Sequence, residues 1–218
     1  GIFGVIGYLI GLNTTRFTQT TLLKVTIIYL LSGLGVAMLA AQNSAWWENS
    51  LSYMGHDAGS DFFFRSTLFF GGFLAVLVGN LLLRDYRVLE QKGYLNKWTM
   101  YFLTYVLNAV GILIMLIGIF RTTVNPLSDM IHNGSGSILA VSLVTASFLL
   151  PILIKKLAPE FKIISVIIGS AIILTGVLWA VFGIASFVFF EIALFGLVAL
   201  WVPLFFQATK LLVEESKN

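Results

Sequence analysis

The most constraining feature of this 218-residue chain is a series of six apolar segments, each long enough to cross a lipid bilayer. A helix needs about 20 apolar residues to span the hydrocarbon core. The segments are continuously apolar rather than alternating, which predicts helices and argues against a transmembrane β-barrel. We therefore expect an all-α protein, an integral membrane bundle of six transmembrane helices. The predicted spans lie at about 22–42, 62–83, 98–120, 131–154, 163–182 and 188–209.

The composition agrees with this class, and the basic residues predict an orientation. Of all residues, 58% are hydrophobic and only 11% are charged, too few polar side chains to cover a water-soluble globule. Lys and Arg accumulate on the cytoplasmic side of membrane proteins. Of the 13 Lys and Arg residues, only Arg65 and Arg121 lie in the turns opposite the chain ends. We predict a multi-pass protein of the cell membrane with both termini in the cytoplasm.

The chain divides into three parts. Residues 1–21 form an apolar, glycine-rich stub and a cytoplasmic lead-in, residues 22–210 form the transmembrane domain, and residues 211–218 form a cytoplasmic tail. The start lacks the basic region with which a cleavable signal peptide begins. For residues 1–12 three interpretations stay open: a close-packing stub, an interfacial helix, or the end of a longer segment.

Composition also limits the partners and cofactors. A sequence pI of about 9.2 would suggest a nucleic-acid partner in a soluble protein, but anionic lipid accounts for basic residues beside a membrane. No nucleic-acid partner is expected. The chain has no Cys, which excludes disulfides and thiolate metal sites. We expect no cofactor, and as partners we expect membrane lipids, anionic ones among them, or another membrane protein.

Polar side chains collect in two outer loops, at 43–61 and 121–130, and at the helix ends beside them. Side chains so placed could bind a lipid headgroup or a partner protein. The candidate ligand-binding residues are Glu48, Ser52, Asp61, Arg65, Arg121, Asp129, His132 and Glu191.

The charged candidates each allow a structural and a functional interpretation. Arg65 lies one helical turn after Asp61, so it could pair with that carboxylate or bind an anionic headgroup through its planar guanidinium. Arg121 could cap the end of the third span. Glu191 is embedded among apolar residues, where a carboxylate needs a partner. The outer arginines and the histidines are the available cations.

His132 is the candidate for chemistry. Asp129 precedes it by three residues on the same helix face and could orient the imidazole as a general base, or the histidine could be a pH sensor. The small residues at 133–137 leave a thin helix surface, suited either to close packing or to a groove for a lipid chain.

A metal site is the weaker possibility. His56 and His132, with one or two of Glu48, Asp57 and Asp129, could form a two-histidine, carboxylate zinc site. No metal-binding spacing supports it, so we expect no metal.

A family resemblance rests on four short segments: ENSLSYMG at 48–55, FFFRS at 62–66, GIF at 118–120 and IH at 131–132. Together these resemble the bacterial domain-of-unknown-function family nine-nine-eight and, more distantly, the Frag/DRAM/Sfk-like six-helix membrane proteins. The resemblance covers roughly residues 22–210. Arg121 stands where the family pattern has a proline after the phenylalanine.

The resemblance implies a six-helix fold and a role in lipid handling, lipid remodelling or regulation of membrane proteins. Only Ser52, Arg65 and His132 match its motif positions, and it assigns no chemistry to them.

Three functions follow from these observations. The first is a non-enzymatic accessory or lipid-organising protein that binds a lipid headgroup at its outer rim. The second is a membrane-embedded lipid hydrolase or transferase with His132 and Asp129 as its catalytic residues. The third is a small-solute transporter or channel, for which the uncharged polar residues at membrane depth offer a thin path. These are Asn80, Asn108, Thr145, Thr175 and Gln207.

Overall fold

The structure is a computed structural model that describes residues 18–43, 46–122 and 124–215. All six long helices within these ranges are apolar enough to cross a membrane. The predicted all-α bundle of a multi-pass membrane protein is confirmed, and the stub at 1–12 lies outside the described residues. The helices are α2 (Gln19–Ala40), α3 (Asp61–Gln91), α4 (Lys97–Ile119), α5 (Pro126–Leu153), α6 (Pro159–Ala180) and α7 (Phe187–Glu215), with 3₁₀ helices η1 (Trp46–Glu48) and η2 (Leu51–Gly55).

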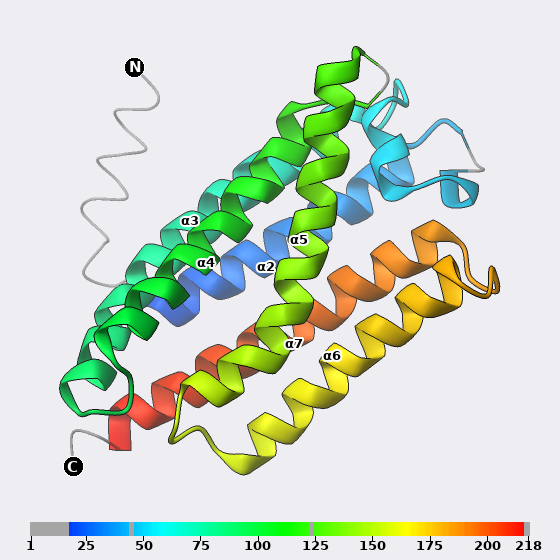
Figure 1. Cartoon of the computed structure of the whole chain (residues 1–218). Helices are drawn as coiled ribbons and strands as arrows, with labels where there is room; N and C mark the ends of the chain where they lie inside the picture. Colours follow the sequence, from blue (N-terminus) through cyan, green and yellow to red (C-terminus); the bar gives the residue numbers. More distant parts are fainter. Residues whose placement is uncertain (1–17, 44–45, 123, 216–218) are drawn as a thin grey trace, which may run out of the picture.

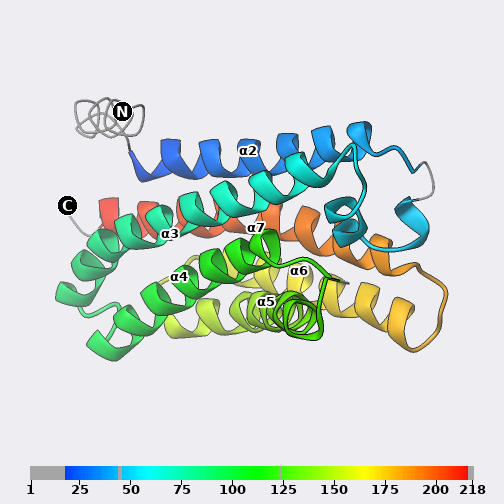
Figure 2. The same cartoon turned by 90° about the horizontal axis from the view of Figure 1, so that it is seen from above.

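The helices form two groups with α5 between them (Figure 1). Helices α2, α3 and α4 pack in sequence order, α6 and α7 form a second hairpin, and α5 joins α4 to α6. Helix α7 also contacts α2, α3 and α5, so it is a second link between the two groups. Figures 1 and 2 show α2 starting and α7 ending at one end of the bundle, while η1 and η2 cover the other. We call the latter the η1–η2 end.

The helix boundaries follow from local sequence. The side chains of Thr18, Asn96 and Asn125 each accept a hydrogen bond from the backbone N–H three residues later, as N-caps do. Proline, which lacks the N–H that a helix start would leave unpaired, begins α5 and α6. Helix α3 ends at Gln91 and is followed by Lys92 and then Gly93, whose φ of 74° suits glycine. The N–H of Tyr94 there donates to the carbonyl of Leu89, which completes a Schellman cap.

Glycines let α3 and α4 approach closely. A Cβ at Gly72 would lie 2.5 Å from the carbonyl oxygen of Gly111, and a Cβ at Gly111 would lie 2.7 Å from that of Gly72. Seven residues further along α4, a Cβ at Gly118 would lie 2.9 Å from the carbonyl oxygen of Arg65. Small residues are what close helix packing in membranes requires. This contact places the side chain of Arg65 beside the last turn of α4.

Polar side chains inside the bundle join helices. The Nδ2 of Asn108 donates to the Oδ1 of Asn80 at 3.3 Å between α4 and α3. In the other group, the buried Ser165 hydroxyl donates to the carbonyl of Ser147 at 2.6 Å and accepts from the indole N–H of Trp201 at 2.6 Å. The second network fixes α5, α6 and α7 to one another.

Candidate functional site

The loop from α2 to α3 is organised by Asp57. Its carboxylate accepts backbone N–H groups of Gln42 and Asn43 at 2.9–3.1 Å, and of Gly59 and Ser60 at 3.0–3.2 Å. These hydrogen bonds, first those from Gln42 and Asn43, lower the pKa of Asp57 to about 2. The carboxylate joins the two ends of the loop, and this structural use replaces the metal-ligand role considered for it.

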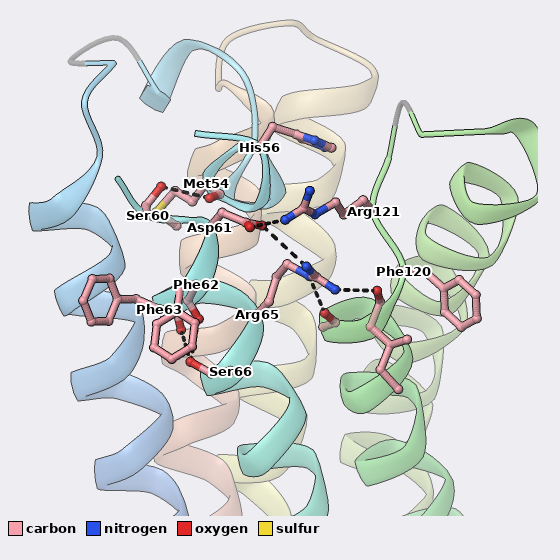
Figure 3. Close-up of polar contacts among 12 residues, drawn as sticks. Met54, His56, Ser60, Asp61, Phe62, Phe63, Arg65, Ser66, Phe120 and Arg121 are labelled. Carbon is pink, nitrogen blue, oxygen red and sulfur yellow. Dashed lines mark hydrogen bonds and ion pairs between the residues drawn. The ribbon is translucent and has the colours of Figure 1, made fainter. Parts of the chain in front are cut away.

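An ionic cluster lies where α3 begins and α4 ends (Figure 3). The carboxylate of Asp61 accepts a hydrogen bond from the Nη2 of Arg121, and its Oδ1 lies 3.9 Å from the Nη1 of Arg65. We call these three residues the Asp61 cluster. The predicted pairing of Arg65 with Asp61 is present, but Arg121 makes the closer ion pair. Arg121 also keeps one buried donor, its Nε, without a hydrogen-bond partner among the described residues.

Most of the hydrogen bonding of Arg65 is directed at α4. Its Nε donates to the carbonyl of Gly118 at 3.0 Å and its Nη2 donates to that of Ile119 at 3.0 Å. Carbonyls in the last turn of a helix have no partner within the helix, and a cation is favoured there by the helix dipole. Arg65 therefore caps α4 from a neighbouring helix, which explains a cation at the otherwise unfavourable start of α3.

His132, in the second turn of α5, extends the same cap. It is buried, and its Nδ1 lies 2.7 Å from the carbonyl oxygen of Phe120. Since the carbonyl only accepts, Nδ1 carries the proton, and in the neutral imidazole Nε2 is then the acceptor. The predicted partner, Asp129, instead accepts from the Nδ2 of Asn133 at 3.0 Å. A backbone carbonyl rather than a carboxylate orients this imidazole.

His56 belongs to the loop side of the same region. Its Nε2 hydrogen bonds with the hydroxyl of Thr122. Burial lowers the pKa of His56, and the positive charge of Arg121 and the nearby imidazole of His132 add to the effect. Within the described residues no group of three or more His, Cys, Asp or Glu side chains could hold a metal ion.

Glu191, near the start of α7, connects that helix to η2. Its Oε2 accepts the backbone N–H of Leu51 at 2.6 Å, the first residue of η2. The predicted need for a partner is thus met by a backbone donor. None of the ion pairs among the described residues includes Glu191.

A cavity of about 480 Å³ lies beneath η2, between α5 and α7, and we call it the α5–α7 cavity. Its wall is mostly apolar, with aromatic rings from Trp179, Phe187, Phe190 and Phe195. Ligand cavities commonly have this size and this combination of an apolar wall with a few polar groups. The polar side chains in its wall are Ser52, His132, Asn133, Ser137 and Glu191.

The α5–α7 cavity has a neighbour toward the middle of the bundle. A second, almost wholly apolar cavity of about 150 Å³ shares Leu34, Leu68, Leu139 and Phe195 with its wall. Among residues 133–137, Asn133, Gly136 and Ser137 line the α5–α7 cavity, whereas Ser135 is buried in the bundle. A Cβ at Gly134 or Gly136 would meet no atom within 4 Å, which favours the groove over the close-packing interpretation of residues 133–137.

The candidate residues thus separate into three sets. Ser52, His132 and Glu191 meet in the α5–α7 cavity, Asp61, Arg65 and Arg121 form the Asp61 cluster, and neither Glu48 nor Asp129 lines the cavity. Glu48 is exposed in η1.

Sequence reasoning missed several cavity residues. Asn133 and Ser137 are four residues apart on α5, so their spacing predicts a shared polar face beside His132. The aromatic rings of Trp179, Phe187 and Phe190 pack on one another, with centroids 4.6 Å apart for Trp179 and Phe187 and 5.6 Å apart for Trp179 and Phe190. No local pattern indicates that pairing, because it joins α6 to α7.

No family model, curated protein or solved structure matches the chain.

Proposed function

We propose that this protein is a lipid-binding membrane protein, an accessory or lipid-organising component that holds one lipid in the α5–α7 cavity. The observation that carries the proposal is the composition of the cavity wall. Five polar side chains from three elements line a space whose wall is otherwise apolar: Ser52 of η2, His132, Asn133 and Ser137 of α5, and Glu191 of α7. A lipid matches this arrangement, because it joins a polar head to an apolar chain.

The adjoining central cavity supports a lipid over a small polar solute. A chain that leaves the α5–α7 cavity past Leu139 meets only a little polar surface, from Thr26 and Tyr86, in the central cavity. A transported polar solute would need hydrogen-bonding groups along this path. An acyl or alkyl chain needs none.

The contacts of the outer arginines shift the proposed headgroup site away from them. Arg65 donates to two carbonyls of α4, and Arg121 pairs with Asp61. Neither arginine lines the α5–α7 cavity. The proposed headgroup contacts are therefore Ser52, His132 and Glu191 rather than the cations that first suggested an anionic headgroup.

The proposal also includes the orientation of the protein in the membrane and its family resemblance. The positive-inside rule supports cytoplasmic termini, which would place the η1–η2 end and the cavity in the outer leaflet of the cell membrane. The resemblance of four short segments to domain-of-unknown-function family nine-nine-eight agrees with a six-helix membrane protein that handles lipid.

A matched pair of glycine variants tests the proposal. Gly136 lines the cavity and Gly134 does not, although both lie on α5 with open space where a Cβ would be. We expect Gly136→Leu to fill the cavity and to lose the lipid that co-purifies with the wild type, measured by native mass spectrometry. Gly134→Leu should retain it. Equal lipid retention by both variants, or a wild type that carries no lipid, would contradict the proposal.

A second candidate function, lipid hydrolysis or transfer, is favoured by the orientation of His132. Because Nδ1 donates to the carbonyl of Phe120, the free acceptor Nε2 belongs to a side chain in the cavity wall, as a general base requires. Turnover of labelled lipids by the wild type and its loss in His132→Asn, with lipid retention intact, would favour the enzyme. A wild type that binds lipid without converting it would favour the accessory protein.

A further inference from the structure

Glu191 has an unusual setting for a carboxylate. It lies within a membrane-spanning helix and in the wall of the α5–α7 cavity, and it forms no ion pair with any described residue. Its protein contact is one backbone N–H, that of Leu51. A carboxylate has about four lone-pair sites, so most of its accepting capacity remains for something inside the cavity.

The other polar groups of the cavity are also better suited to accept than to neutralise an anion. Nε2 of His132 is an acceptor in the tautomer fixed by Phe120. Ser52 and Ser137 contribute hydroxyls, which can accept or donate, and Asn133 contributes an amide that already donates to Asp129. Among the residues that the structure describes, no Lys or Arg lines the cavity. A phosphate or carboxylate headgroup would therefore meet Glu191 without a counter-charge.

We infer that the α5–α7 cavity selects an amphiphile with a primary ammonium head, no phosphate, and an apolar chain. The inference rests on the proposed function and names the class of lipid that the same site takes. The ammonium has three N–H donors and no acceptor. It pairs with the carboxylate of Glu191 and donates to Nε2 of His132, while the chain extends toward the central cavity.

Four amphiphiles that share one alkyl chain length and differ in their headgroups test this selectivity on the wild-type protein. Hexadecylamine, hexadecanol, hexadecanoate and hexadecyltrimethylammonium are each added to the wild type in nanodiscs, and binding is measured by native mass spectrometry. We expect hexadecylamine to bind at one molecule per chain and about tenfold more tightly than hexadecanol, the effect of one charge-assisted hydrogen bond. Hexadecanoate should bind most weakly.

The variants assign the preference to Glu191. Gln at this position still offers an oxygen to the N–H of Leu51, so η2 keeps its contact while the charge is removed. We expect Glu191→Gln to bind hexadecylamine and hexadecanol equally. Glu48→Gln removes a charge from the exposed surface of the same loop and should keep the wild-type preference.

The outcomes separate this inference from the proposed function. If Gly136→Leu loses lipid but the four heads bind equally, or hexadecanoate binds best, the cavity binds lipid and the ammonium inference is overturned. Equal binding of hexadecylamine and hexadecyltrimethylammonium also overturns it, because the latter has the charge without an N–H donor. If no amphiphile binds and no lipid co-purifies, the proposed function itself fails. The ligand series needs only the wild type, so it tests the ammonium inference even if Glu191→Gln does not fold.

Discussion

In the Asp61 cluster the polar side chains face one another and the end of α4, whereas in the α5–α7 cavity they face an open space. Arg65 directs two donors at the carbonyls of Gly118 and Ile119, and Arg121 directs one at Asp61. Glu191 and His132 each use one atom to bind the protein and keep other lone pairs for the cavity. Both regions lie at the η1–η2 end.

This difference separates side chains that stabilise the fold from side chains that remain available to a ligand. The most conspicuous outer charges in the sequence belong to the first kind. The weaker signals, one histidine and one carboxylate among apolar residues, belong to the second. The proposed binding site is therefore based on hydrogen-bonding capacity left after folding rather than on charge.

The largest expected effect comes from removing Arg65. Arg65→Ala deletes two hydrogen bonds from a cation to carbonyls of α4 and weakens the support of Asp61, so we expect the free energy of unfolding in detergent to fall by about 2–4 kcal/mol. The lipid retained by each folded molecule should not change. Lys210→Ala is the matched control, because the exposed Lys210 lies 3.7 Å from Glu214 and such pairs contribute at most about 1 kcal/mol. Lipid loss at wild-type stability would place Arg65 in the binding site instead.

His132 lines the α5–α7 cavity and also hydrogen bonds to the end of α4 beside the Asp61 cluster, so two substitutions should divide its roles. His132→Phe removes the hydrogen bond to Phe120 and the cavity acceptor, and we expect it to lower the free energy of unfolding by about 1–2 kcal/mol and to weaken hexadecylamine binding. His132→Asn places its Nδ2 near the former Nδ1 and should keep the stability while binding is still weakened. The measurements are unfolding in detergent and native mass spectrometry. If the two variants bind hexadecylamine as the wild type does, His132 only caps α4.

The fold was predictable because its determinants are local. Segment length and continuous hydrophobicity define six spans, and the caps at Thr18, Asn96 and Asn125 with Gly93 mark where helices begin and end. The structure places most of these boundaries within four residues of the sequence-based ones, although α5 begins earlier, at Pro126. Helices α3 and α7 continue beyond their predicted ends, to Gln91 and Glu215. Polar residues in the last turns of those two helices conceal the extension from a hydrophobicity argument.

The candidate site was predictable only in part, because its contacts are not local. The sequence indicates Arg65 and His132 as notable residues, but their partners are backbone carbonyls of another helix, reached through the Gly111 and Gly118 packing. A backbone acceptor has no signature in a sequence. The small residues at 133–137 were a local indication of the cavity, but they suit close helix packing as well as a groove. The position of α7 in the fold, which no local pattern predicts, distinguishes the two.

Tyr86 tests whether unused hydrogen-bonding capacity is sufficient to indicate a ligand contact. Its fully buried hydroxyl, in the wall of the central cavity, has no hydrogen-bond partner among the described residues. Tyr86→Phe removes the cost of burying a hydroxyl without a hydrogen-bond partner, so we expect the free energy of unfolding to stay equal or rise by about 1 kcal/mol. Hexadecylamine binding should be unchanged, because an alkyl chain has no acceptor for this hydroxyl. Reduced binding in Tyr86→Phe would show that a polar group of the ligand reaches this depth.

The smallest effect concerns acidification of the loop side of the Asp61 cluster. The pKa of His56 lies below its ordinary value of 6.5 because of burial, the charge of Arg121 and the nearby imidazole of His132, with Asp61 and Asp129 acting in the opposite direction. The folded state therefore binds fewer protons than the unfolded state below about pH 6.5, so this contribution to stability is complete above that pH and decreases as the pH falls. We expect the melting temperature to decrease between pH 7.5 and 5.5, and His56→Gln to reduce that decrease. Asp57 does not titrate between pH 7.5 and 5.5, because its pKa is about 2. If the melting temperature decreases equally in the wild type and in His56→Gln, the titrating group is one other than His56.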